Sequence, residues 1–137
     1  LLLLFLIPNL VMAETISTKD LYELQEKSRK TCSDWFEKEW GKGRQKTEDG
    51  FITSSYENHY NKKMNKCFIL QSTTSFSTNN KDNPKVIETK GVWDIQSQKE
   101  YGELTMIDSI IFSCSVKGVK CKSENEWESL IHGYMND

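Results

Sequence analysis

The side chains best suited to chemistry in this sequence are grouped between positions 56 and 61. Tyr56, Glu57, His59, Tyr60 and Asn61 bring phenol, carboxylate, imidazole and amide groups close together along the chain. His59 is the candidate acid or base, because the ordinary pKa of imidazole lies near neutrality. Tyrosines and a histidine beside a bonded cysteine also form packed, hydrogen-bonded corners, and this structural interpretation is favoured over a site.

Other catalytic patterns are missing from the sequence. It contains no Gly-x-Ser-x-Gly turn for a serine nucleophile. Its many carboxylates have no spacing that singles out a pair for glycoside chemistry. Trp40 is a further binding candidate, because it lies off the main apolar stripe of the first expected helix. We therefore expect non-covalent binding rather than catalysis, with a small hydrolase centred on His59 as the alternative.

The apolar run from Leu1 to Ala13 indicates export. It ends in Val11-Met12-Ala13, a small-residue pattern typical of signal-peptidase cleavage. The run has no initiator Met or basic residue before it, so we expect the leader to extend upstream. It is shorter than the roughly 20 residues of a membrane-spanning helix. We expect residues 1–13 to be a signal peptide, residues 14–137 to form a single mature domain, and the protein to be periplasmic or secreted.

Export determines how the cysteines are interpreted, because an oxidising compartment favours disulfides. Proximity along the chain favours Cys114 with Cys121, which leaves Cys32 for Cys67, while crossed pairings and free thiols remain open. No two cysteines have the close spacing of zinc ligands, and the two histidines stand alone. We expect no metal site and no cofactor.

The charge balance argues against a polyanionic partner. The chain has 20 acidic and 18 basic residues, so no summed positive field would hold nucleic acid. The sequence does not identify a partner; an envelope protein is one candidate.

The pattern of apolar residues predicts a helix at each end of the mature chain. The first begins near Ser17 and Asp20, which have capping-box spacing, and ends at Gly41. The last begins at Ser123 and carries an apolar stripe of Trp127, Leu130, Ile131 and Tyr134.

Between the two helices the sequence predicts a sheet. Lys42 to Gly50 is a polar loop. In the segment 51–66 the spacing of Tyr56, Tyr60 and Met64 favours a short helix, and a short strand at Phe51-Ile52-Thr53 is the alternative. Four strands are then expected, at 67–76, 86–95, 101–107 and 110–116, with a turn over 77–84. In the last strand, alternation places Ile110, Phe112, Cys114 and Val116 on one face. Short connections predict an antiparallel sheet of about four strands, packed with both helices in a two-layer, disulfide-stapled α+β domain.

One segment resembles a signature of small exported bacterial proteins of uncharacterised function. It is the His-Tyr-Asn-x-Lys-x-x-Lys-Cys-Phe pattern at 59–68. Lys99-Glu100-Tyr101-Gly102 and the Cys121-Lys122-Ser123-Glu124 helix are similar to the same group. The resemblance implies a signal peptide and a cysteine framework, and it implies no activity, ligand or catalytic residue.

Overall fold

Two helices are present where the sequence predicts them. The computed structural model describes residues 16–41, 43–48, 50–77 and 84–136. Helix α1 spans Thr18–Trp40, is capped by Ser17, whose side chain accepts from the Asp20 amide, and ends at Gly41. Helix α2 spans Glu124–Met135, and Ser123 caps it through the Glu126 amide. The predicted signal peptide and the centre of the turn predicted over 77–84 lie outside the described residues.

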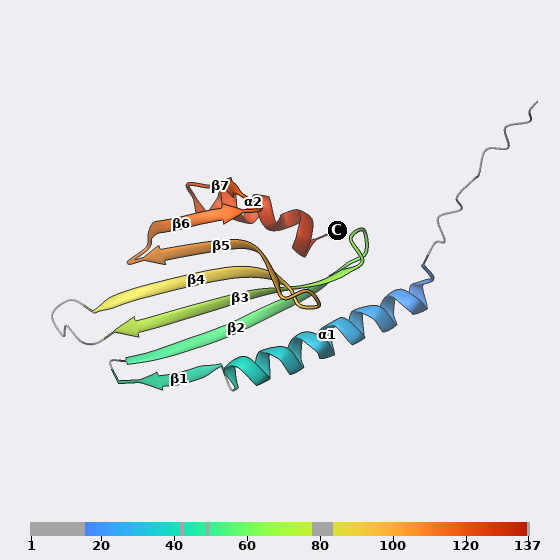
Figure 1. Ribbon diagram of the computed structural model, residues 1–137, viewed down its shortest axis with the longest axis horizontal. Coiled ribbons are helices and arrows are strands. Elements are labelled where there is room, and N and C mark those ends of the chain that lie inside the picture. The colour runs from blue at the N-terminus through green and yellow to red at the C-terminus, as the bar shows by residue number, and fades with distance from the viewer. Residues whose placement is uncertain (1–15, 42, 49, 78–83, 137) are drawn as a thin grey trace, which may run out of the picture.

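The strands between the helices form one antiparallel sheet of seven strands in chain order (Figure 1). They are β1 Arg44–Thr47, β2 Gly50–Asn61, β3 Lys66–Ser77, β4 Lys85–Asp94, β5 Lys99–Ile107, β6 Ile110–Val116 and β7 Val119–Lys120. The prediction of about four strands is therefore wrong, although the α+β class, the antiparallel pairing and a helix at each end fit the structure.

The largest error is β2, for which a helix was the expected structure. Tyr56 and Tyr60 recur with a period of four, which also fits a strand because residues an even number apart share one face. Twelve β2–β3 pairs run from Gly50 opposite Ser77 to Asn61 opposite Lys66. Pairing along the full length of β3 thus overrides the helical pattern.

Two further strands are short, so their sequences give little signal. β1 lies in the segment predicted as a loop, and β7 holds only Val119 and Lys120. The turn before β7 uses Lys117 and Gly118, both with positive φ, at 49° and 80°. This left-handed geometry fits a tight hairpin and suits Gly118.

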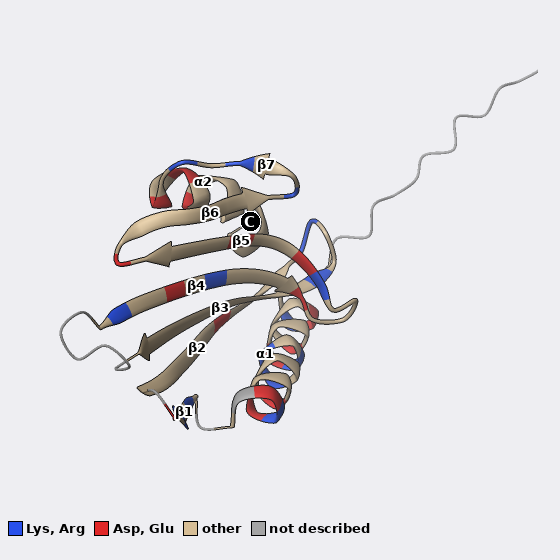
Figure 2. Cartoon of the chain, turned by 60° about the vertical axis from the view of Figure 1, so that its left-hand side comes forward, with Lys and Arg blue, Asp and Glu red and all other residues tan. Residues whose placement is uncertain are grey.

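The sheet separates the two helices, which corrects the predicted two-layer arrangement. Phe68 belongs to the core cluster with Trp127 and Ile131 of α2. Its neighbour Ile69 belongs to the cluster with Cys32 and Phe36 of α1. Because successive strand residues point to opposite faces, α1 and α2 cover opposite faces of the sheet. Figure 2 shows the mixture of acidic and basic residues that α1 carries.

A bulge changes the faces predicted for β6. The β5–β6 register shifts after Thr105, so Met106 pairs with Ile111 and no residue of β5 pairs directly with Phe112. Ile111 packs against the α2-side core, whereas Ile110 and Phe112 are 73% and 76% exposed. The extra residue reverses the alternation within the strand.

The cysteines form one disulfide. Cys114 and Cys121 are bonded at the base of the β6–β7 hairpin. Cys32 on α1 and Cys67 on β3 are buried free thiols, so the second predicted disulfide is not formed in this structure. Both thiols lie on the α1 side of the sheet, since Cys67 shares a strand face with Ile69.

Candidate binding site

The residues grouped between 56 and 61 do not form one site. They lie on β2, whose alternation sends Tyr56 and Tyr60 to the α1 side and Glu57, His59 and Asn61 to the other side. Tyr56 packs against Phe36 of α1 with ring centroids 4.5 Å apart. The strand therefore divides this group between the two faces of the sheet.

Asn61, one of the binding candidates, is held by hydrogen bonds within the protein. It is fully buried, and its Nδ2 donates to the carbonyl oxygens of Gly133 and Tyr134 at 2.9 and 3.3 Å. Its Oδ1 accepts from the Met64 amide at 2.9 Å. These bonds join the last turn of α2 to the β2–β3 turn, where Tyr60 donates to Asn65 at 2.5 Å.

His59 and Trp40 are two further candidates from the sequence. His59 is half-buried on β2, opposite Phe68. Trp40 is the last residue of α1, and its side chain lies outside the part of the chain that the structure describes. His59 lines none of the five surface hollows of the described residues that we consider.

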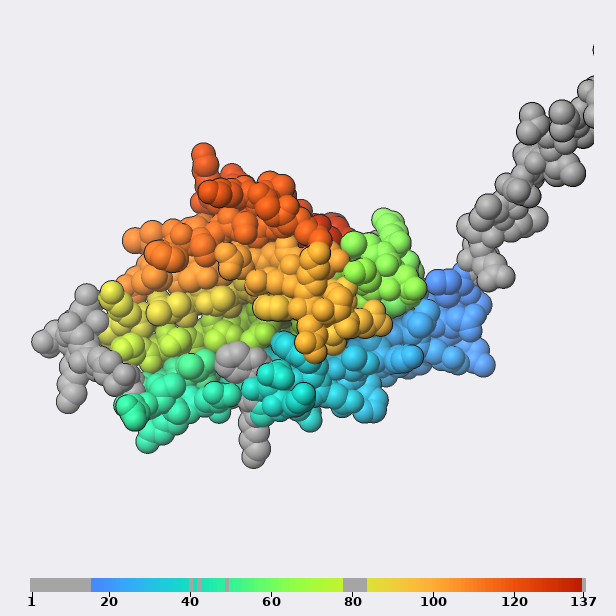
Figure 3. Space-filling view, viewed as in Figure 1, coloured from blue at the N-terminus to red at the C-terminus, as the bar shows by residue number. Residues whose placement is uncertain are grey.

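Two of these hollows meet at Trp93, on the α1 side of the sheet. One has a volume of about 300 Å³ and the other about 230 Å³. Figure 3 shows the segment around the β4–β5 turn lying against α1 in this region. We name the two hollows together the Trp93 site. Its lining residues are Gln71, Thr73, Thr89, Gly91, Trp93 and Glu100 in the larger hollow, and Trp35, Glu39, Trp93, Asp94, Ile95 and Gln98 in the smaller one.

Strand pairing places the larger hollow's side chains together. Gln71 pairs with Gly91, Thr73 with Thr89, and Trp93 with Glu100 across three adjacent strands. All of them share the strand face of Ile69, which packs beneath α1. The smaller hollow adds Trp35 and Glu39, which are four residues apart and so share one face of the helix.

Gly91 makes room for the Trp93 ring. A Cβ atom at position 91 would lie 2.8 Å from Trp93 Nε1, closer than carbon and nitrogen can pack without a shift. The indole is half-buried, and it lines both hollows. The absence of a side chain at Gly91 thus sets the position of the ring between them.

Two polar side chains of the larger hollow, Gln71 and Thr73, are bonded to each other and to Ser54. Gln71 Nε2 donates to Ser54 Oγ and to Thr73 Oγ1, each at 3.3 Å. Ser54 Oγ and Thr73 Oγ1 are also 3.1 Å apart and share a hydrogen bond. This network holds the floor of the hollow on β2 and β3.

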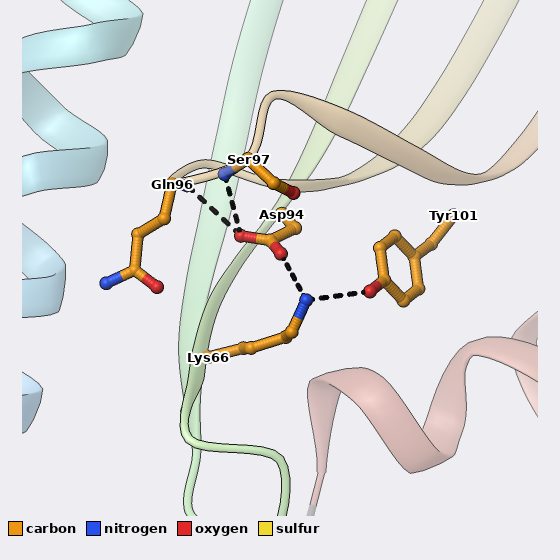
Figure 4. Close-up of polar contacts among 5 residues, drawn as sticks. All are labelled: Lys66, Asp94, Gln96, Ser97 and Tyr101. Atoms are coloured by element: carbon orange, nitrogen blue, oxygen red, sulfur yellow. Dashed lines mark hydrogen bonds and ion pairs between the residues drawn. The ribbon is translucent and has the colours of Figure 1, made fainter.

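The carboxylates of the Trp93 site have different environments. Asp94 is buried and paired with Lys66, whose Nζ lies 2.6 Å from Asp94 Oδ2 and 3.0 Å from the Tyr101 hydroxyl (Figure 4). Glu39 and Glu100 form no ion pair with any described residue. Burial, together with the nearby Glu103 carboxylate, raises the pKa of Glu100.

The Lys66 cluster serves structure rather than catalysis. Hydrogen bonds to Asp94 and Tyr101 raise the pKa of Lys66, so the amine remains protonated and cannot act as a base near neutrality. Asp94 Oδ1 accepts from the amides of Gln96 and Ser97, which closes the β4–β5 turn. The cluster fixes the turn that carries one wall of the smaller hollow.

The Trp93 site combines an aromatic ring with carboxylate, amide and hydroxyl side chains. Within the described ranges, no group of three or more His, Cys, Asp or Glu side chains could hold a metal ion. Neither α1 nor α2 combines the length and apolar character of a membrane-spanning helix, and these are the helices of the described residues.

The sequence did not single out the Trp93 site. Five of its lining residues nevertheless occupy alternate positions that would share a strand face: Gln71, Thr73, Thr89, Gly91 and Trp93.

No protein-family model, curated protein or solved structure matches this chain.

Proposed function

We propose that this protein is an exported, non-catalytic binding domain whose small-molecule ligand occupies the Trp93 site. One observation carries the proposal: the indole of Trp93 lines two hollows at once, and Gly91 leaves the space that the ring needs. A concave surface with an aromatic ring and a few polar groups is the usual form of a small-ligand site.

Export is supported by the chemistry of the sulfurs. The Cys114–Cys121 disulfide fits a non-cytoplasmic, oxidising environment. The apolar run at 1–13 has the composition of a leader peptide. We place the mature protein in the periplasm or outside the cell, with an envelope component as a candidate partner. Fractionation of the producing cell tests this; recovery of the mature form only from the cytosol would contradict it.

The hydrolase alternative centred on His59 gains no support from the geometry. Glu57, His59 and Asn61 share a strand face, but Asn61 is committed to α2 by hydrogen bonds. The two hollows that Trp93 lines lie on the other face of the sheet. A His59→Gln variant therefore should keep ligand binding at Trp93.

A ligand screen tests the binding proposal. Thermal unfolding of the full chain would be followed with a panel of small sugars, amines, amino acids and carboxylates, since a ligand that binds only the folded state raises Tm. We expect at least one compound to raise the Tm of the unmodified protein and of Phe112→Ser, an exposed control. The same compound should leave Trp93→Ala and Trp93→Phe unshifted or weakly shifted. An equal response in all four proteins would overturn the proposal, as would no response to any compound.

A further inference from the structure

The charge that lines the Trp93 site has one sign. Glu39 and Glu100 line the two hollows, and among the described residues no Lys, Arg or His lines either of them. The third carboxylate, Asp94, is neutralised by Lys66. The uncompensated charge on this surface is therefore negative, which favours a cationic ligand and disfavours an anionic one.

The aromatic rings favour the same ligand. Trp35 and Trp93 both line the smaller hollow, and Glu39 lines it with them. The face of an indole ring attracts cations, tryptophan most strongly among the aromatic side chains, and this attraction underlies recognition of quaternary ammonium groups. Two indoles and a carboxylate around one hollow thus combine two independent attractions for an ammonium group.

The hydrogen-bond network of the larger hollow argues against a ligand recognised mainly by its hydroxyl groups. The donors of Gln71 are bonded to Ser54 and Thr73. A sugar would have to compete with these bonds and would leave Glu39 and Glu100 uncompensated. A cation needs no rearrangement of the network.

We propose that the Trp93 site binds a small organic ammonium cation between Trp35 and Trp93, with Glu39 and Glu100 balancing its charge. This inference rests on the proposed function and adds the chemical class of the ligand. The environment of Glu100 agrees with it: burial and the nearby Glu103 carboxylate raise the pKa of Glu100, and the charge of a bound cation would favour the ionised carboxylate and lower that pKa.

Choline and its uncharged carbon isostere, 3,3-dimethylbutan-1-ol, provide the test, because the two molecules have nearly the same shape and differ in charge. Binding to the full chain would be measured by tryptophan fluorescence at neutral pH and low salt, with tetramethylammonium as a second cation. We expect choline to bind at least roughly tenfold more tightly than the isostere, the ratio that a cation–π contact and a nearby carboxylate supply.

Matched variants assign the effect to residues. Glu39→Gln and Glu100→Gln should each weaken choline binding by roughly fivefold and leave the weak binding of the isostere unchanged. Trp93→Phe should weaken choline, since a phenyl ring attracts cations less strongly than indole. Glu128→Gln removes an exposed carboxylate on α2 and should bind choline as the unmodified protein does.

The outcomes separate this inference from the proposed function. Equal affinity for choline and the isostere, or no effect of either Gln variant, would overturn the cation proposal. The absence of any fluorescence response to choline or tetramethylammonium, each at about 10 mM, would overturn it too, since the dissociation constant would then exceed that concentration. If a neutral compound of the screening panel then raises Tm in a Trp93-dependent way, the binding function stands; if none does, both proposals fail.

Discussion

Lys66 Nζ lies 2.6 Å from Asp94 Oδ2, which joins the start of β3 to the end of β4 through an ion pair with a buried partner. The Asp94 side chain is 2% exposed and the Lys66 side chain 33% exposed. The same carboxylate also accepts two amide hydrogen bonds from the β4–β5 turn. Asp94 therefore stabilises both the sheet end and the turn beside the Trp93 site.

Replacing Asp94 with Asn should destabilise the protein by about 2 kcal/mol, because Lys66 would lose its charged partner at a half-buried position. Urea unfolding monitored by circular dichroism measures the change. Asp34→Asn is the matched control: Lys30 Nζ lies at the same 2.6 Å from Asp34 Oδ2, but both side chains are exposed. That variant should leave the free energy of unfolding nearly unchanged, because water screens an exposed ion pair. Equal losses in the two variants would contradict the role given to Asp94.

The Asp94 contribution should disappear in acid. Burial alone would raise the pKa of Asp94, but hydrogen bonds from Lys66 and Ser97 outweigh it and lower the pKa. A carboxyl with a lowered folded-state pKa stabilises the protein above its unfolded pKa of about 3.9, and this contribution is lost as pH falls through the folded value. The stability gap between the unmodified protein and Asp94→Asn should be full at pH 6 and shrink below about pH 4. A gap that stays constant to pH 2 would contradict this.

The sequence was most informative where a local signal and tertiary packing agree. Ser17, Gly41 and Ser123 mark the helix ends because capping depends on residues within one turn. It was least informative for β2, where Tyr56 and Tyr60 satisfy both a helical and a strand period. There, pairing with β3 decided the structure, and pairing depends on residues far apart in the chain.

The candidate site was harder to predict than the fold. A cluster that is dense in sequence, such as His59 beside Tyr60, is divided by a strand between two faces. Trp93 and Trp35 are remote in sequence and line the same hollow only because α1 packs against the sheet. To predict that they lie close together, one must know which face of the sheet α1 covers. The alternation of residues along the strands does not show which face that is.

Gly91→Ala tests the geometry of the Trp93 site without changing its polar groups. The added Cβ would lie 2.8 Å from Trp93 Nε1 and should displace the indole. We expect a shift in tryptophan emission and a loss of about 1–3 kcal/mol in stability, as in other overpacked sites.

Gly133→Ala is the control for this substitution. Nothing lies within 4 Å of a Cβ atom at position 133, which is inside α2. Since alanine is favoured over glycine in a helix, this variant should gain about 0.5–1 kcal/mol and keep its emission spectrum. Unchanged emission and stability in Gly91→Ala would show that the ring does not depend on the space at Gly91.

The cysteines give a prediction that distinguishes the disulfide from the buried thiols. Cys32 is fully buried, and burial together with the nearby Cys67 raises the pKa of Cys32 to about 12. Native protein should therefore resist iodoacetamide at pH 8, because the thiolate is the reactive form. Unfolding without reductant should expose two alkylatable thiols, and unfolding with reductant should expose Cys114 and Cys121 as well. Loss of the Cys114–Cys121 disulfide should lower the free energy of unfolding by about 2.5 kcal/mol. Mass spectrometry counts the labels; an unfolded, unreduced chain without any label would mean that Cys32 and Cys67 are bonded in the isolated protein.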